Sequence, residues 1–200
     1  MKRYGFFGGS FNPPTYAHLE IAKLSLINIE LDKVFFVPVG NNYKKPDMIE
    51  ENLRYKMLKL ICEGEKNIEV ESLELNQDKA LNTIQAFRKI KNKYKTSENY
   101  YIMGADNFVK LPTWDNAEEL ISNYKFIVFQ RKGAELEKLL NNNELVKKYI
   151  KNVKILNIKE NLDCSSGIIR NIIKQGKKDI AKIYTKTEVV DYINENKLYN

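Results

Sequence analysis

A glycine-rich turn that leads into a helix is the first segment of the chain able to support chemistry. It follows a short apolar stretch and reads Gly8-Gly9-Ser10-Phe11-Asn12-Pro13-Pro14-Thr15-Tyr16-Ala17-His18. Because glycine lacks a Cβ, this backbone can approach a phosphate closely, and the helix N-terminus behind it offers unpaired N–H groups. The segment matches neither G-x-G-x-x-G nor a Walker loop. It predicts a phosphate site of another kind, with a tight strand-to-helix turn as the alternative.

Thr15 and His18 are the polar side chains at the start of this helix. They lie three residues apart, so they share one helix face at its positive end. His18 is the only histidine in the chain, which excludes metal sites built from several histidines. An imidazole here can donate a hydrogen bond to phosphate oxygens, and the alternative is a structural histidine. The place behind Gly8 and Gly9 favours the phosphate-binding interpretation.

A second group of anion-binding side chains lies near the C-terminal end. Ser165 or Ser166 can cap a helix that ends at Gly176, and Arg170 lies one turn from Ser166 on the same face. Arginine is the preferred side chain for a bidentate phosphate contact, and this lysine-rich chain has only five arginines. Hydroxyls, N–H groups and a guanidinium would converge on one anion. The alternative is an ordinary capped surface helix.

The elements that position these groups follow an alternating pattern. We expect strands at residues 4–7, 34–39, 68–75, 100–103, 126–129 and 153–156, and helices at 15–28, 51–61, 81–94, 166–175 and 187–195. The strands are continuously apolar, which indicates a sheet buried on both faces. Right-handed crossovers then give an α/β fold with a Rossmann-like, open, doubly wound parallel sheet. Ligands of such sheets bind beyond the carboxyl ends of the strands.

Two further polar residues follow strands at this edge. Asp106 comes just after Gly104, where a carboxylate can accept hydrogen bonds from ribose hydroxyls. Arg131 follows the strand that ends at Phe129 and is placed to enter the same cleft. The alternative for Arg131 is a solvated residue at a strand end.

Length and composition fit one globular domain. The 200 residues are 43% apolar and 30% charged, without a repeat, linker or composition break. We expect a Rossmann-like core over residues 1–160 and a C-terminal helical segment over 161–200. Cys62 and Cys164 lie far apart and suit reduced thiols. Because the sequence has no signal segment or long apolar run, we expect a cytoplasmic protein without a membrane partner.

The net charge of +7 is a weak argument for nucleic acid as a partner. Lysine pairs alternate with acids instead of forming a block, and the chain is rich in Lys and Asn, which indicates a coding bias. We therefore expect a solvated surface, with nucleic acid disfavoured as the main ligand. The sequence leaves open whether the protein forms a homo-oligomer.

The turn from Gly8 to His18 resembles the G-G-[ST]-F-D-P-x-[HT]-x-G-H signature of the nucleotidyltransferase superfamily. Because further matches follow in order, the whole chain is similar to the nicotinate-nucleotide adenylyltransferase family. They are Val37-Pro38-Val39-Gly40 with Lys44-Lys45, Asn82-Thr83-Ile84, Tyr101-Ile102-Met103-Gly104-Ala105-Asp106, Leu111-Pro112-Thr113-Trp114 and Cys164-Ser165-Ser166-Gly167-Ile168-Ile169-Arg170. Asn12, Thr15 and Ala17 stand where the family usually has Asp, His and Gly.

The resemblance implies in-line transfer of an adenylyl group from ATP to nicotinate mononucleotide, with Mg²⁺ arriving on ATP and no dedicated metal site. It implies catalytic roles for His18, Thr15, Arg170 and Lys44. The residues expected to bind ATP are Gly8, Gly9, Ser10, Phe11, Gly104, Asp106, Ser165 and Ser166. Those expected to bind the mononucleotide are Asn12, Thr83, Trp114, Arg131 and Lys45. Trp114 would stack on the pyridine ring, with a core or hinge anchor as the alternative.

Two other interpretations stay open from the sequence. The acceptor could be nicotinamide mononucleotide, phosphopantetheine or another phosphorylated small molecule, because the superfamily shares the turn from Gly8 to His18. A non-catalytic nucleotide-binding or RNA-binding homologue would explain Asn12 and Thr15 together with the positive charge. A fragment of a class I aminoacyl-tRNA synthetase is disfavoured, because the chain is short and has no K-M-S-K-S.

Overall fold

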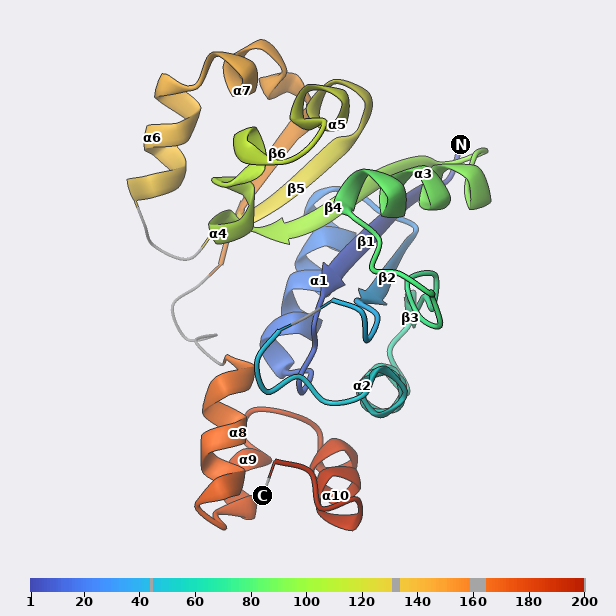
Figure 1. The fold of residues 1–200 in the computed structure, drawn as a ribbon, viewed down its shortest axis with the longest axis vertical. Coiled ribbons are helices and arrows are strands. Elements are labelled where there is room, and N and C mark those ends of the chain that lie inside the picture. The colour runs from blue at the N-terminus through green and yellow to red at the C-terminus, as the bar shows by residue number, and fades with distance from the viewer. Residues whose placement is uncertain (44, 131–133, 159–164, 200) are drawn as a thin grey trace.

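A six-stranded parallel sheet forms the centre of the molecule (Figure 1). The computed structural model describes residues 1–43, 45–130, 134–158 and 165–199. The strands are β1 (Arg3–Gly9), β2 (Lys33–Pro38), β3 (Ile68–Val70), β4 (Glu98–Gly104), β5 (Lys125–Gln130) and β6 (Val153–Asn157). Their order is β3-β2-β1-β4-β5-β6, and every neighbouring pair is parallel. This confirms the predicted Rossmann-like α/β fold.

Helices connect and cover the strands. They are α1 (Tyr16–Asn28), α2 (Glu51–Cys62), α3 (Thr83–Lys93), α4 (Ala105–Phe108), α5 (Ala117–Asn123), α6 (Ala134–Asn142), α7 (Glu144–Lys148), α8 (Ser166–Lys174), α9 (Lys178–Ala181) and α10 (Thr187–Glu195). Two 3₁₀ turns, η1 (Leu111–Thr113) and η2 (Ile150–Asn152), complete the connections. No helix among these described residues has the length and apolarity needed to cross a membrane.

Alternate strand residues fill the cores on the two faces of the sheet. Phe7, Phe36 and Ile102 pack in one cluster with apolar side chains of α1, α2, α8 and α10. Phe126 and Val128 pack in a second cluster with α3, α5, α6 and α7. Because both faces are covered, the inner strands β2 and β5 carry apolar runs without alternation, as the sequence predicts, whereas the edge strands β3 and β6 include exposed polar residues.

The third strand is shorter than expected. The sequence predicts a strand over 68–75, but β3 ends at Val70 and the chain turns over residues 73–76. The Leu75 N–H donates to the Ser72 carbonyl (2.9 Å), and Asn76 has a positive φ of 53°. The apolar residues of this segment therefore fill the core from a turn, which their alternation with polar residues did not distinguish from a strand.

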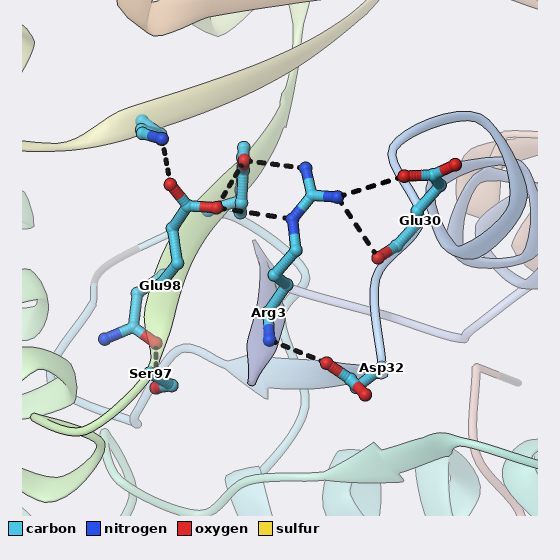
Figure 2. Close-up of polar contacts among 8 residues, drawn as sticks. Arg3, Glu30, Asp32, Ser97 and Glu98 are labelled. Carbon is cyan, nitrogen blue, oxygen red and sulfur yellow. Dashed lines mark hydrogen bonds and ion pairs between the residues drawn. The ribbon is translucent and has the colours of Figure 1, made fainter. Parts of the chain in front are cut away.

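A polar network joins the amino ends of the strands, opposite the ligand edge (Figure 2). Arg3 donates to the Tyr100 hydroxyl (2.9 Å) and to Glu98 (3.3 Å), and the Tyr100 hydroxyl donates to Glu98 (2.8 Å). Lys125 also donates to Glu98, and this contact holds the pKa of the Glu98 carboxyl below its usual value. The network ties β1, β4 and β5 together.

The C-terminal helices pack against α1 and α2 at one end of the molecule (Figure 1). Ile169, Val190 and Ile193 belong to the same core cluster as the sheet. The Thr185 hydroxyl donates to the Pro14 carbonyl (2.9 Å), so this segment also contacts the turn before α1. The C-terminal helices thus share the core of the sheet. The division into a core over residues 1–160 and a helical segment over 161–200 stays a prediction.

Candidate active site

A cleft opens at the carboxyl edge of the sheet, where the strand order reverses between β1 and β4. Its larger lobe has a volume of about 590 Å³. Loops after β1, β2, β3 and β4 all contribute to its wall. The sequence-predicted residues on this wall are Gly8, Gly9, Ser10, Phe11, His18, Lys45, Thr83, Gly104, Asp106, Trp114 and Ser166. The reversal point is where open α/β sheets bind their ligands.

A smaller lobe of about 360 Å³ lies beside it, against the N-terminus of α8. Ser10, His18, Lys45, Asp106 and Ser166 line both lobes, so the two form one continuous cleft. The predicted residues that line only the smaller lobe are Asn12, Ser165 and Arg170. The fold thus brings the two predicted phosphate motifs to one place, although about 150 residues separate them in sequence.

His18 stands where the lobes meet, and Thr15 fixes its ring. Thr15 is the N-cap of α1, and its backbone N–H donates to His18 Nδ1 (3.0 Å). Because Nδ1 accepts this bond, the neutral ring carries its proton on Nε2. The ring also packs against Phe11 and Phe7, at centroid distances of 5.0 and 5.9 Å. Thr15 is fully buried and is not part of the wall of either lobe. Its predicted contact with phosphate therefore stays a prediction.

The N-terminus of α8 carries the second motif. Ser165 is the N-cap, and its side chain accepts from the Ile168 N–H (3.4 Å). The sequence left Ser165 and Ser166 as equal candidates for this cap. Ser166 instead donates to the Pro13 carbonyl (2.7 Å), and Arg170 donates to the Asn12 carbonyl (2.8 Å). Both side chains therefore brace the turn before α1 while lining the smaller lobe.

Asp106 and Trp114 lie on the β4 side of the cleft. Asp106 is exposed in the first turn of α4, directly after Gly104. A Cβ at Gly104 would overlap the Asp106 carboxylate in the position that it has here. Trp114 follows η1 and is half-buried, with its side chain packed against the second core cluster and on the cleft wall. The position suits a stacking ring that is held by the core.

Gly8 meets an aromatic residue of the neighbouring strand. A Cβ at Gly8 would overlap the hydroxyl of Tyr101 in β4. Phe11 has a φ of 46°, which bulky residues rarely adopt, and its buried ring packs against Phe7 and Phe36. The turn is therefore held by packing in a conformation that exposes its backbone to the cleft.

The remaining predicted residues lie in or near the loop after β2. Lys45 donates to the Ser10 hydroxyl (3.4 Å) across the cleft mouth. The Asn12 side chain donates to the Asp47 carbonyl (2.8 Å) and accepts from the Tyr199 hydroxyl (2.7 Å), so it joins this loop to the C-terminal end. Its predicted contact with the mononucleotide stays a prediction. Lys44, Arg131 and Cys164 lie outside the described residues.

Arg54 supports the site and was not assigned a role from the sequence. It is fully buried in α2 and donates to the carbonyls of Ile49 (2.9 Å), Ser10 (3.0 Å) and Val39 (2.6 Å). Burial lowers the pKa of its guanidinium, and the nearby Glu51 carboxylate opposes that shift. Arg54 thus fixes the loops after β1 and β2 relative to each other. The feature of the sequence that could have indicated this buried role is an arginine on the apolar face of a helix in a lysine-rich chain.

A resident metal ion requires several ligating side chains close together. Within the described ranges, no three side chains among His, Cys, Asp and Glu gather into a metal-binding group. Mg²⁺ prefers several oxygen ligands and usually retains water.

The fold and cleft define a nucleotide-binding α/β protein, and the cytidylyltransferase-like family matches it over residues 6–172. It is therefore a nucleotidyltransferase. A protein of Clostridium novyi named "Probable nicotinate-nucleotide adenylyltransferase" is 38% identical over 177 residues, covering 87% of this chain and 88% of that protein. One of the same name from Clostridium acetobutylicum is 34% identical over 202 residues and covers 100% of both. The chain thus belongs to the nicotinate-nucleotide adenylyltransferase family.

A solved structure agrees with this fold. Nicotinic acid mononucleotide adenylyltransferase of Plasmodium falciparum, complexed with NaAD, superposes with a TM-score of 0.76 over 100% of this chain and 98% of that chain. Its sequence identity of 23% makes this a likeness of fold.

Proposed function

We propose that the protein transfers the adenylyl group of ATP to nicotinate mononucleotide, giving nicotinate adenine dinucleotide and pyrophosphate. One observation carries the proposal: both phosphate motifs line one two-lobed cleft, with His18 at the junction of the lobes. Membership of the family named for this reaction supports it. The match of a structural neighbour that holds the product dinucleotide agrees with it.

The reaction is an in-line displacement at phosphorus. A phosphate oxygen of the mononucleotide forms a bond to the α-phosphorus of ATP, and the bond from that phosphorus to the bridging oxygen breaks. The electron pair leaves with pyrophosphate. Such a transfer depends on positioning and on donors placed where negative charge develops, so no protein nucleophile is required.

The described residues divide this work between the lobes. His18 Nε2–H donates to the α-phosphate oxygens at the junction, and Arg170 with the N-terminus of α8 holds the β- and γ-phosphates in the smaller lobe. Asp106 accepts from the ATP ribose, and Trp114 and Thr83 hold the mononucleotide in the larger lobe. Mg²⁺ enters as part of the Mg·ATP substrate and neutralises phosphate charge.

The test is a comparison of acceptors. We expect pyrophosphate release and a dinucleotide product from Mg·ATP with nicotinate mononucleotide, measured by a coupled assay and mass spectrometry. Release only with nicotinamide mononucleotide or phosphopantetheine would reassign the acceptor. ATP binding without release from any acceptor would overturn the proposal in favour of a non-catalytic nucleotide-binding protein. A cytoplasmic location and a homo-oligomeric state stay predictions for fractionation and light scattering.

A further inference from the structure

Glu74 is a buried acid in the cleft that the proposed reaction does not use. It lies in the turn after β3, is 8% exposed, and lines the larger lobe. Two other glutamates, Glu51 and Glu71, are buried to a similar extent. Glu51 accepts from the backbone N–H of Asn41 and of Asn76, and Glu71 accepts from Lys93. These two carboxylates are satisfied by the protein itself.

Glu74 differs because its carboxyl has no such partner in the part of the chain that the structure describes. Among residues 1–43, 45–130, 134–158 and 165–199, none forms a hydrogen bond or ion pair with it. A buried carboxyl without a partner costs free energy in either protonation state. Since this one lies on the wall of a ligand cavity, a bound ligand can supply the missing partner.

The charged and titratable groups around Glu74 belong to α3, β4, the loop after β2 and α2. Lys89 of α3 acts on it at a distance, Tyr101 of β4 lines the same cavity, and Tyr43 and Lys45 follow β2. The Glu51 carboxylate of α2 and the Glu74 backbone carbonyl both lie next to the Cβ position of Gly40, at 3.1 and 2.6 Å. Burial outweighs Lys89 and raises the pKa of the Glu74 carboxyl to about 7.

The mononucleotide carries a phosphate and a carboxylate against one pyridinium charge, so it is an anion at neutral pH. An ionised Glu74 would repel it, whereas the neutral acid can donate a hydrogen bond to one of its oxygens. We propose that Glu74 contacts the bound mononucleotide as the neutral acid, so that mononucleotide binding takes up a proton. This inference rests on the proposed function and adds a specificity-determining residue to it.

The direct test is the proton count on binding. Isothermal titration calorimetry of nicotinate mononucleotide into the full chain at pH 8, in two buffers of different ionisation enthalpy, gives that count without any variant. We expect uptake of about 0.9 proton per mononucleotide, because a group with a pKa near 7 is about nine-tenths ionised at pH 8 before binding. The dissociation constant should rise about fivefold from pH 7 to pH 8.

Glu74→Gln keeps the shape and a donor but has no proton to take up. We expect it to bind with an uptake near zero and with the same affinity at pH 7 and pH 8. Glu71→Gln is the matched control, since it alters a buried glutamate that has its own partners, and it should keep the uptake of the unmodified protein.

The outcomes separate this inference from the proposed function. Binding and pyrophosphate release without proton uptake would overturn the role of Glu74 alone. Equal uptake by the unmodified protein and Glu74→Gln would do the same, because another group would then bind the proton. No binding of nicotinate mononucleotide would overturn the proposed function and this inference together.

Discussion

Replacing Arg54 with Met should destabilise the protein strongly, because three loop carbonyls would lose their shared donor. The guanidinium is fully buried and forms three hydrogen bonds of 2.6 to 3.0 Å. Methionine fills part of the same space but donates to none of the three oxygens. Each buried carbonyl oxygen left without its donor costs about 1–3 kcal/mol, and removing a charge that had to be desolvated offsets part of that sum. We therefore expect the free energy of unfolding to fall by about 3–5 kcal/mol.

Arg88 offers a matched control for this substitution. Its Nη2 donates to both Glu119 carboxylate oxygens (2.7 and 2.8 Å) and its Nε donates to one of them (3.2 Å), but this contact lies at the surface. Exposed ion pairs contribute about 0–1 kcal/mol, so Arg88→Met should stay near the stability of the unmodified protein. The comparison separates the effect of losing any arginine side chain from the effect of losing the buried hydrogen bonds of Arg54.

Urea unfolding followed by circular dichroism measures both variants on the same scale. A fall below 1 kcal/mol for Arg54→Met, or equal effects of the two substitutions, would refute the argument that Arg54 fixes the cleft loops. The Michaelis constants for both substrates should rise in Arg54→Met, because the loops after β1 and β2 line both lobes.

Three further predictions follow from other parts of the structure. Trp114→Ala should raise KM for the mononucleotide much more than KM for ATP in steady-state assays, and equal increases would indicate a scaffold role. Arg170→Lys should raise KM for ATP about tenfold or more, since a lysine cannot make the planar bidentate contact; an unchanged KM would exclude that contact. Glu98 has a lowered pKa in the folded state, so its contribution to stability is present above about pH 4 and is lost as the pH falls further. The stability difference between the unmodified protein and Glu98→Gln, measured by urea unfolding, should therefore shrink below pH 4, and a difference that grows would contradict the ion-pair network.

The fold and the turns that carry the two proposed phosphate motifs were predictable because their signals are local. Apolar runs mark the strands, and a glycine pair before Thr15 or a serine pair before Arg170 marks a turn that opens a helix. The sheet then fixes where these turns lie, since parallel strands present their carboxyl ends at one edge. The short helices α4, α5 and α7 gave too few turns of amphipathic pattern to be expected from the sequence.

The supporting contacts were not predictable because each joins distant segments. Arg54 reaches Ser10 across 44 positions, and Tyr199 reaches Asn12 across 187. The periodic patterns of helices and strands do not connect residues so far apart in the chain. From the sequence, Arg54 is therefore recognised only as an arginine within a helix. The same holds for Glu74, because its lack of a partner among the described residues depends on what the folded chain places around it.

The central claim is that adenylyl transfer takes place at the junction marked by His18, and His18→Ala tests it most directly. The measurement is kcat for pyrophosphate release from Mg·ATP and nicotinate mononucleotide, with circular dichroism and urea unfolding to verify the fold of the variant. We expect kcat to fall about 100-fold or more, as for loss of one donor to a developing oxyanion, while the fold is retained. A folded variant with near-normal turnover would contradict the account.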